Sequence, residues 1–301
     1  MALTGVSAAG VWVPSIGVVS GTVSQHRRGL ALGVVTAGVG ASIVVSGVLV
    51  ALARQLFGPD VWRQVWAAEA ALGFAILGLI LFFFHSPTRD PAGTPAVTAR
   101  AIFQVPRWGA ITAAYAAFAM GYMLYISYLV AALEADAGFT SGHASTAYSI
   151  FGFTMIFGGL LVGGLSDRAG RRPTLVVGNA IMAGCALLIL VGSEPWVGLS
   201  AVSFGILVSG LGSVFAAYVS DHLSPEAAVA AFGAITVPFG ILQGAAPPIG
   251  GLLADSTGSF TATFVLSAGA FLVTAAAAAF LHGGRGHRGV RLRDDPAAVR
   301  S

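Results

Sequence analysis

The most specific chemical pattern in the sequence is the run GGLSDRAGRR, which lies between two long apolar stretches. Its aspartate can accept hydrogen bonds from a helix N-terminus or from arginine, and such charge-assisted bonds are strong. Its glycines allow close helix contact and a tight turn. The run therefore predicts a charged contact between helices, whereas the simpler alternative is a basic loop that happens to contain an acid. The residues of this conformational-switch motif are Gly163, Asp167, Arg168, Gly170, Arg171 and Arg172.

Three tyrosines form the second candidate group. Tyr115, Tyr122 and Tyr125 lie seven and three residues apart within one apolar stretch, which places them near one face of a helix. An aromatic ring with a hydroxyl group can stack on an organic solute and orient it. We therefore expect these side chains to line a substrate cavity. The alternative is the aromatic belt at the membrane surface, which is the simpler interpretation for the neighbouring Tyr128.

Gln243 is a further candidate for the cavity. A side-chain amide is costly in hydrocarbon unless it is hydrogen-bonded, so we expect it to face a wet cavity or, alternatively, another helix. Pro247 and Pro248 follow it closely in the sequence. Two prolines would kink the helix, which suits a gate as well as a fixed packing feature.

The remaining ionisable groups carry weaker signals. Glu69 is the only charged residue inside an apolar stretch, which by default suggests an ion or proton site, but it lies near Trp62 and Trp66 at the end of its stretch. Asp136, His143 and Asp255 fall in loops or at helix ends, where solvated charges are ordinary. A lone cysteine excludes a Cys-based metal site, and no phosphate-binding or hydrolase motif occurs. We expect neither an enzyme nor a resident metal or cofactor.

The composition indicates that these side chains are held by helices in a bilayer. Of the 301 residues, 56% are hydrophobic and 9% are charged, and the mean hydropathy is +0.86. A spanning helix needs about 20 mainly apolar residues. We therefore predict an all-α polytopic transmembrane helical bundle with nine spans. The stretches are 2–24, 29–53, 64–85, 108–133, 144–165, 173–193, 196–219, 227–253 and 258–282.

The arginines predict the orientation of these spans. All 15 basic residues are arginine, and when the loops are assigned alternately to two sides only Arg54 and Arg63 fall on the poorer side. The arginine-rich side is expected to be cytoplasmic, which places the C-terminus inside and the N-terminus outside a cell membrane. The arginines do not cluster on one folded domain, so nucleic acid is not an expected partner. The lipid bilayer is.

Glycine positions indicate an internal repeat. An ungapped offset of 200 residues superposes Gly5 on Gly205, Gly33 on Gly233 and three further pairs. Small residues recur where helix backbones approach closely, although glycine-rich helices also coincide by chance. The repeat leaves the three spans between 108 and 193 without a counterpart, and Met1 opens directly into a span. We therefore expect a transporter that lacks its first three helices.

At this point the chain resembles the major facilitator superfamily (MFS), whose cytoplasmic loops carry the pattern of residues 163–172. The resemblance implies that the nine spans are family helices four to twelve and that the solute cavity lies near the bilayer midplane. It divides the chain into a partial N-terminal bundle (1–85), a cytoplasmic linker (86–107), a C-terminal six-helix bundle (108–282) and a cytoplasmic tail (283–301). The tyrosine-rich span and the segment FGILQGAAPPIGGLLADSTGSF are similar to the YbfB/YjiJ-like branch.

The resemblance also gives Asp167 a position. We expect its carboxylate to face the N-terminus of the span 29–53, near Arg27, Arg28 and Gly29, at the cytoplasmic interface between the two bundles. A carboxylate there would stabilise one closed state through the helix dipole and charge-assisted bonds.

These features together predict a secondary active transporter that moves a small organic solute by alternating access. Coupling to a proton is implied by the resemblance alone. A membrane subunit of an ATP-driven transporter and a non-transporting truncated fragment are the alternatives.

Overall fold

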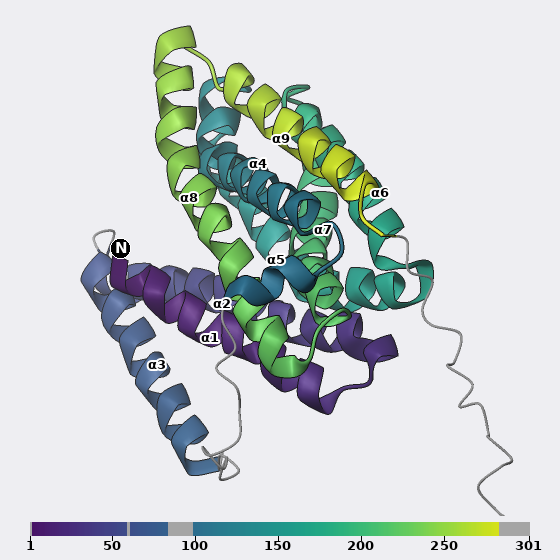
Figure 1. Cartoon of the computed structure of the whole chain (residues 1–301). Helices are drawn as coiled ribbons and strands as arrows, with labels where there is room; N and C mark the ends of the chain where they lie inside the picture. Colours follow the sequence, from purple (N-terminus) through teal and green to yellow (C-terminus); the bar gives the residue numbers. More distant parts are fainter. Residues whose placement is uncertain (1, 59–60, 84–98, 283–301) are drawn as a thin grey trace, which may run out of the picture.

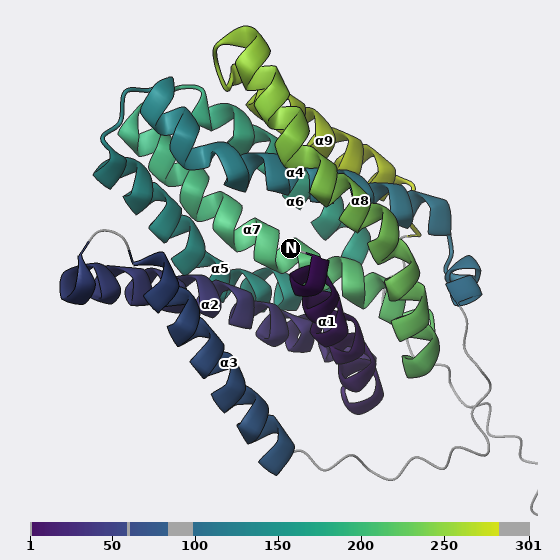
Figure 2. The ribbon, with the colours of Figure 1, turned by 90° about the vertical axis from the view of Figure 1, so that its left-hand side faces the viewer.

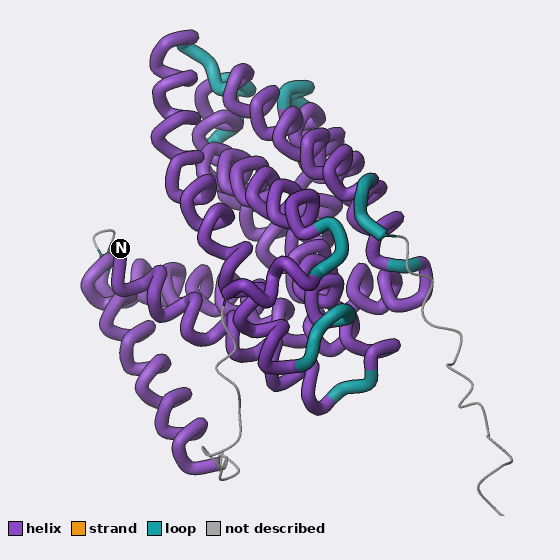
Figure 3. The backbone as a smooth tube through the Cα atoms, in the orientation of Figure 1, coloured by secondary structure: helices purple, strands orange, loops and turns teal. Residues whose placement is uncertain are grey.

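The computed structural model describes residues 2–58, 61–83 and 99–282 (Figure 1), and over these ranges its regular structure is helical throughout. Two short 3-10 helices, η1 (Gln25–Arg27) and η2 (Ala99–Gln104), accompany the α-helices. Figure 3 shows that short loops join the helices. The α-helices are α1 (Ala2–Thr22), α2 (Arg28–Phe57), α3 (Trp62–Phe83), α4 (Trp108–Ala135), α5 (Ser141–Ala169), α6 (Arg171–Ile189), α7 (Glu194–Ser220), α8 (Pro225–Thr257) and α9 (Thr261–Ala279).

Each predicted span corresponds to one helix, so the prediction of an all-α helical bundle is confirmed. The boundaries differ by a few residues, as at α6, which ends at Ile189 where the composition predicted 193. Eight helical segments in the described part of the chain are long and apolar enough to cross a membrane. Large apolar side chains such as Phe153 and Val177 stand more than half exposed on the outside. Lipid is the solvent that such a surface requires.

The helices form two groups. Helices α4 to α9 pack against one another around a core of aromatic and small residues, which includes Phe204, Phe215 and Phe271. Helices α1 to α3 lie on one side of this bundle (Figures 1 and 2). Within the contact between the groups, α2 lies along α5 and α7, and α1 lies along α8.

Glycines allow α2 and α5 to approach at backbone distance. A Cβ atom built on Gly33 would overlap the carbonyl of Gly159, and one built on Gly159 would overlap the carbonyl of Gly33. The same holds one turn nearer the motif, where a Cβ on Gly163 would overlap the carbonyl of Gly29. Larger residues would separate the helices, so these glycines fix the distance between the groups.

The segment that leads into α4 is held by α7. The Tyr218 hydroxyl donates to the Pro106 carbonyl (3.1 Å) and accepts from the backbone N–H of His282 (3.4 Å), so it joins the start of α4 to the end of α9. Helix η2 packs against α8. Of the predicted linker 86–107, residues 86–98 lie outside the described residues, as does the predicted tail 283–301.

Candidate functional site

Asp167 lies at the end of α5 and caps the N-terminus of α2. Its two carboxylate oxygens accept the backbone N–H groups of Gly29 (3.0 Å) and Leu30 (2.9 Å), which belong to the first turn of α2. The side chain is only 7% exposed. Because the first N–H groups of a helix have no partner within it, a buried carboxylate there satisfies both the hydrogen bonds and the helix dipole. The position is the one expected from the sequence.

Arg171 links this carboxylate to a second one. Its guanidinium group lies 2.5 Å from Asp167 and donates from Nε to Asp221 at 2.9 Å. It also donates to the Ser166 hydroxyl at 2.6 Å. Gly170 makes the turn between α5 and α6 with a φ of +98°, a conformation that side-chain-bearing residues rarely adopt. The turn thus brings Arg171 back onto Asp167.

Arg28 extends the network across the two helix groups. It donates to the Ser220 carbonyl at the end of α7 (2.6 Å) and to the Ser20 carbonyl near the end of α1 (3.0 Å). Its guanidinium group also lies 3.9 Å from the Asp221 carboxylate. A cation at the C-terminal end of a helix is favourable, because the last carbonyls there have no partner within the helix.

Asp221 is the functional residue that the sequence pattern did not identify, because the loop around it holds no arginine. Burial raises the pKa of its carboxyl above the ordinary value, while Arg171, Arg28 and His222 oppose the shift. One of its oxygens, Oδ1, has no hydrogen-bond partner. The available signal was an acid directly after an apolar stretch, at the end of the bundle that carries the motif. We name Asp167, Arg171, Asp221 and Arg28 the inter-group charge network.

Two of the motif arginines stand apart from this network. Arg168 and Arg172 are exposed, and neither makes a hydrogen bond or an ion pair within the residues that the structure describes. The structure therefore brings together Gly163, Asp167, Gly170 and Arg171, and leaves these two arginines on the surface.

The two helix groups meet at the end that contains the network. Their close approaches run from Gly29 and Gly163 to Ile43 and Gly152 along the first half of α2. Beyond this point Gly47 has no atom within 4 Å of the position that a Cβ would occupy. Figure 2 shows α2 passing across the bundle in this way. The groups are thus joined at one end and apart at the other.

Tyr115 and Tyr122 lie where the two groups meet in mid-bundle. Tyr115 is buried and stacks on Phe239 of α8, with ring centroids 4.2 Å apart. Its ring also adjoins Phe232 of α8 at 5.3 Å between centroids, and Phe232 in turn packs against Trp12 of α1. Tyr122 is half-buried and lies nearly parallel to Phe239 at 6.0 Å. Both tyrosines therefore belong to a cluster of rings shared by α1, α4 and α8.

Tyr125 does not share this position, and its burial contradicts the prediction that it lines a cavity. The residue is fully buried, and its ring stacks on Phe204 of α7 at 3.6 Å. Its hydroxyl shares a hydrogen bond of 2.7 Å with Ser200, which donates to the Cys185 carbonyl of α6. Its face of α4 turns into the interior of the six-helix bundle. Three residues of helix rotation beyond Tyr122 were enough to change the environment.

Gln243 and the prolines lie on α8, which continues as one helix from Pro225 to Thr257. The Gln243 side chain is half-buried and makes no hydrogen bond within the described residues. The Tyr128 hydroxyl donates to the Pro247 carbonyl. Tyr128 therefore joins α4 to α8 beside the prolines. This contact between helices adds to the role in the interfacial aromatic belt that its sequence position suggested.

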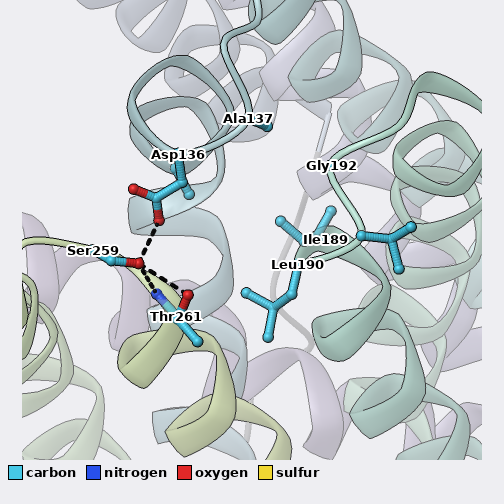
Figure 4. Close-up of a pocket in the computed structure, with 9 residues that line it drawn as sticks. Asp136, Ala137, Ile189, Leu190, Gly192, Ser259 and Thr261 are labelled. Atoms are coloured by element: carbon cyan, nitrogen blue, oxygen red, sulfur yellow. Dashed lines mark hydrogen bonds between the residues drawn. The ribbon is translucent and has the colours of Figure 1, made fainter.

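Two of the other charges singled out in the sequence, Glu69 and Asp136, have local partners. Glu69 accepts a hydrogen bond of 2.7 Å from Ser46 of α2. Asp136 borders an open pocket of about 510 Å³ at the ends of α4 and α6 (Figure 4), where it accepts from the Phe260 backbone N–H at 2.7 Å and from the Ser259 hydroxyl at 3.0 Å. Asp136 thus caps α9, and these bonds are structural.

Comparison with known proteins supplies the family. A family model described as "Uncharacterised MFS-type transporter YbfB" matches residues 2–279. Monocarboxylate transporter 12-B of Danio rerio is 27% identical over 168 residues, which cover 54% of this chain and 35% of that protein. The class G tetracycline resistance protein of Vibrio anguillarum is 29% identical over 165 residues, or 52% of this chain and 40% of that protein. The chain thus spans less than half the length of these relatives.

Solved structures agree on the fold. The Escherichia coli fucose:proton symporter FucP superposes with a TM-score of 0.62 at 15% identity, over 88% of this chain and 71% of that one. A structure of FucP in the outward conformation gives the same TM-score at 14% identity, over 88% of this chain and 70% of that one. A family match over nearly the whole chain and a helical bundle of this arrangement lead to one conclusion. The chain is a multi-pass membrane protein that belongs to the YbfB family of the major facilitator superfamily of transporters.

Proposed function

We propose that this protein is a secondary active transporter that moves a small organic solute by alternating access, with the inter-group charge network as the lock of one closed state. The observation that carries this proposal is the contact of Asp167 with the first turn of α2, because it joins the two helix groups at one end only. A lock at one end is what a rocking transporter requires.

The arginines support an orientation for this lock. Arg27, Arg28, Arg168 and Arg171 all lie at the end of the bundle that is closed. By the positive-inside tendency this end is cytoplasmic, which places the protein in a cell membrane with its C-terminus inside. The structure then corresponds to an outward-facing state. A proton as the coupling ion is a prediction drawn from the family.

The strength of the lock follows from its burial. Each charge-assisted bond between a largely buried carboxylate and backbone N–H groups contributes about 1–3 kcal/mol. Opening the cytoplasmic end would break two such bonds from Asp167 and the bond from Arg28 to the Ser220 carbonyl of α7, whereas the Arg28 bond to α1 lies within one group and is kept. Solute binding must supply a comparable free energy for the other state to be populated.

The test is Asp167→Asn in the full chain, read out by cross-linking across the lock. Leu30 and Gly164 provide the reporter pair, since the Leu30 side chain lies 3.6 Å from the position of a Cβ on Gly164. Both are changed to cysteine after Cys185→Ser removes the native thiol. We expect Asp167→Asn to lower the rate of cross-linking about fivefold or more, because the amide is uncharged and binds a helix N-terminus less well.

The matched control is Arg172→Gln, which changes a charge of the same motif outside the network and should leave the rate unchanged. Equal cross-linking rates in Asp167→Asn and the parent protein, with both correctly folded, would remove the basis for this function.

A further inference from the structure

Stacked rings form a ladder at the centre of the molecule. Tyr115 stacks on Phe239 at 4.2 Å and 23°, and Phe239 lies nearly parallel to Tyr122 at 6.0 Å and 27°. Phe232 of α8 adjoins Tyr115, with ring centroids 5.3 Å apart. Phe232 also packs against Trp12 of α1 in a T-shaped arrangement, with ring centroids 6.4 Å apart. These rings come from α1, α4 and α8, so the ladder lies where the two helix groups meet. We name these five residues the aromatic ladder.

Among the ladder rings of α4 and α8, exposure increases away from the inter-group charge network. Tyr115 and Phe232 are almost completely buried, whereas Phe239 and Tyr122 are half-buried. Trp12 of α1, which packs against Phe232, is also half-buried. The rings of α4 and α8 therefore have a covered end and an open part, and the open part lies on the side where the helix groups separate. An aromatic face that is not covered by protein can stack on a further ring.

Two polar side chains without partners lie beside the open part. Neither the Tyr122 hydroxyl nor the Gln243 amide makes a hydrogen bond within the described residues. Gln243 follows Phe239 by four residues and so lies one turn above it on the same face of α8. Tyr122 contacts Phe239, and Tyr128 bonds Pro247 one turn beyond Gln243, so Gln243 lies between the levels of these two contacts. A hydroxyl and an amide at this depth require a polar partner.

The surrounding helices carry no charge at this level. The acidic residues of α4, α7 and α8 are confined to their terminal turns, and the sequence of α1 contains no charged residue. They are Glu134, Glu194, Glu226 and Asp255. A carboxylate or ammonium ligand would find no counter-charge on these four helices, which makes its transfer from water unfavourable.

We propose that the open part of the aromatic ladder, with Gln243, is the binding site for an uncharged, planar aromatic solute that carries a hydrogen-bonding group such as an amide or a hydroxyl. The ring of the solute stacks beside Phe239 and Tyr122, and its polar group bonds to Gln243 and the Tyr122 hydroxyl. This assignment of the substrate class rests on the proposed transport function.

The test compares matched ligands by equilibrium dialysis with the full chain in lipid nanodiscs. The probes are 2-naphthamide, its fully saturated decalin analogue, and 2-naphthoate. We expect saturable binding of 2-naphthamide and at least about threefold to tenfold weaker binding of the other two, since one lacks the aromatic face and the other carries a charge. Equal or tighter binding of the saturated or the charged probe would overturn the proposal.

Variants locate the site on the ladder. Phe239→Leu should weaken 2-naphthamide binding about threefold to tenfold, Phe239→Trp should retain it, and Gln243→Leu should weaken it by a similar factor. Phe153→Leu is the matched control, because this ring on α5 is 54% exposed on another surface. Unchanged binding in correctly folded Phe239→Leu contradicts the site.

The two proposals fail in different ways. The Leu30 and Gly164 cross-linking assay is run on the same preparations. If 2-naphthamide binding does not change in the Phe239→Leu and Gln243→Leu variants, while the cross-linking rate still responds to Asp167→Asn, the ligand site alone is refuted. A cross-linking rate that does not respond to Asp167→Asn, with ladder-dependent binding intact, refutes the transport lock alone.

Discussion

At the scale of single residues, Asp221 shows how burial and charge compete at the network. Its carboxylate lies 2.9 Å from Arg171 and 3.9 Å from Arg28, yet burial raises its pKa above the ordinary value of 3.8. The free energy lost when the carboxylate is removed from water is therefore larger than the free energy gained from its attraction to the two arginines and His222. The ion pair positions Arg28 and Arg171 more than it stabilises the fold.

This balance predicts a pH dependence with a definite sign. A carboxyl whose pKa is raised on folding adds stability at low pH, which is lost as the pH rises from 3.8 through the raised value. We expect Asp221→Asn, which cannot titrate, to remove this slope. Thermal unfolding midpoints in detergent, measured at steps between about pH 4 and about pH 8, check it. A slope that persists unchanged in the variant would assign the effect to another group.

At the scale of elements, the contact between α2 and α5 depends on positions where only glycine fits. Gly33 lies against the backbone of Gly159, whereas Gly38 on the same helix has no atom within 4 Å of a Cβ position. The two glycines therefore differ in their surroundings although they share a helix. In lipid, helices gain no hydrophobic free energy from association. Small residues at such crossings allow close van der Waals packing, which then holds the helices together.

The element-level prediction compares these two glycines. Gly33→Ala should destabilise the protein by about 1–3 kcal/mol, because the methyl group overlaps the Gly159 carbonyl and pushes the helices apart. Gly38→Ala should be neutral or stabilising by up to about 1 kcal/mol, because alanine favours helix and meets no neighbour. Chemical denaturation in detergent measures both. Equal effects would show that α2 does not depend on this approach.

At the scale of the whole molecule, the proposed rocking motion predicts reciprocal changes at the two ends. The close approaches of α2 and α5 pair Gly40 with Met155 and Ile43 with Gly152, and Gly47 has no atom within 4 Å of a Cβ position. Continued by one turn, this register would bring Gly47 opposite the turn of α5 that contains Ser149. With cysteines at Gly47 and Ser149, the parent protein should cross-link slowly. Asp167→Asn should accelerate this reaction by the factor that slows the Leu30 and Gly164 reaction, because one group rotates against the other.

The same pair distinguishes rocking from loosening. A variant whose two reactions both slow down, or both accelerate, has altered packing without a change of state. Only opposite changes support alternating access.

The sequence by itself determined the elements. Each span is a long apolar run between arginines or turn residues, so its helical form follows from the need to satisfy backbone hydrogen bonds in lipid. The position of Asp167 could also be predicted from the sequence, because the motif combines a carboxylate with residues that shape one particular turn. Helix formation and the shape of a turn depend on residues that are close in the sequence, so the sequence pattern is enough to predict them.

Only the tertiary structure decided which faces meet. Tyr122 and Tyr125 lie three residues apart, yet one belongs to the aromatic ladder and the other to the interior of the six-helix bundle. Asp221 belongs to the network because Arg28 of α2 packs against the end of α7, where it bonds the carbonyl of Ser220. Arg28 and Ser220 are 192 residues apart in the sequence. Helix rotation and the choice of neighbours depend on the packing of all helices together, so no spacing along one segment can specify them.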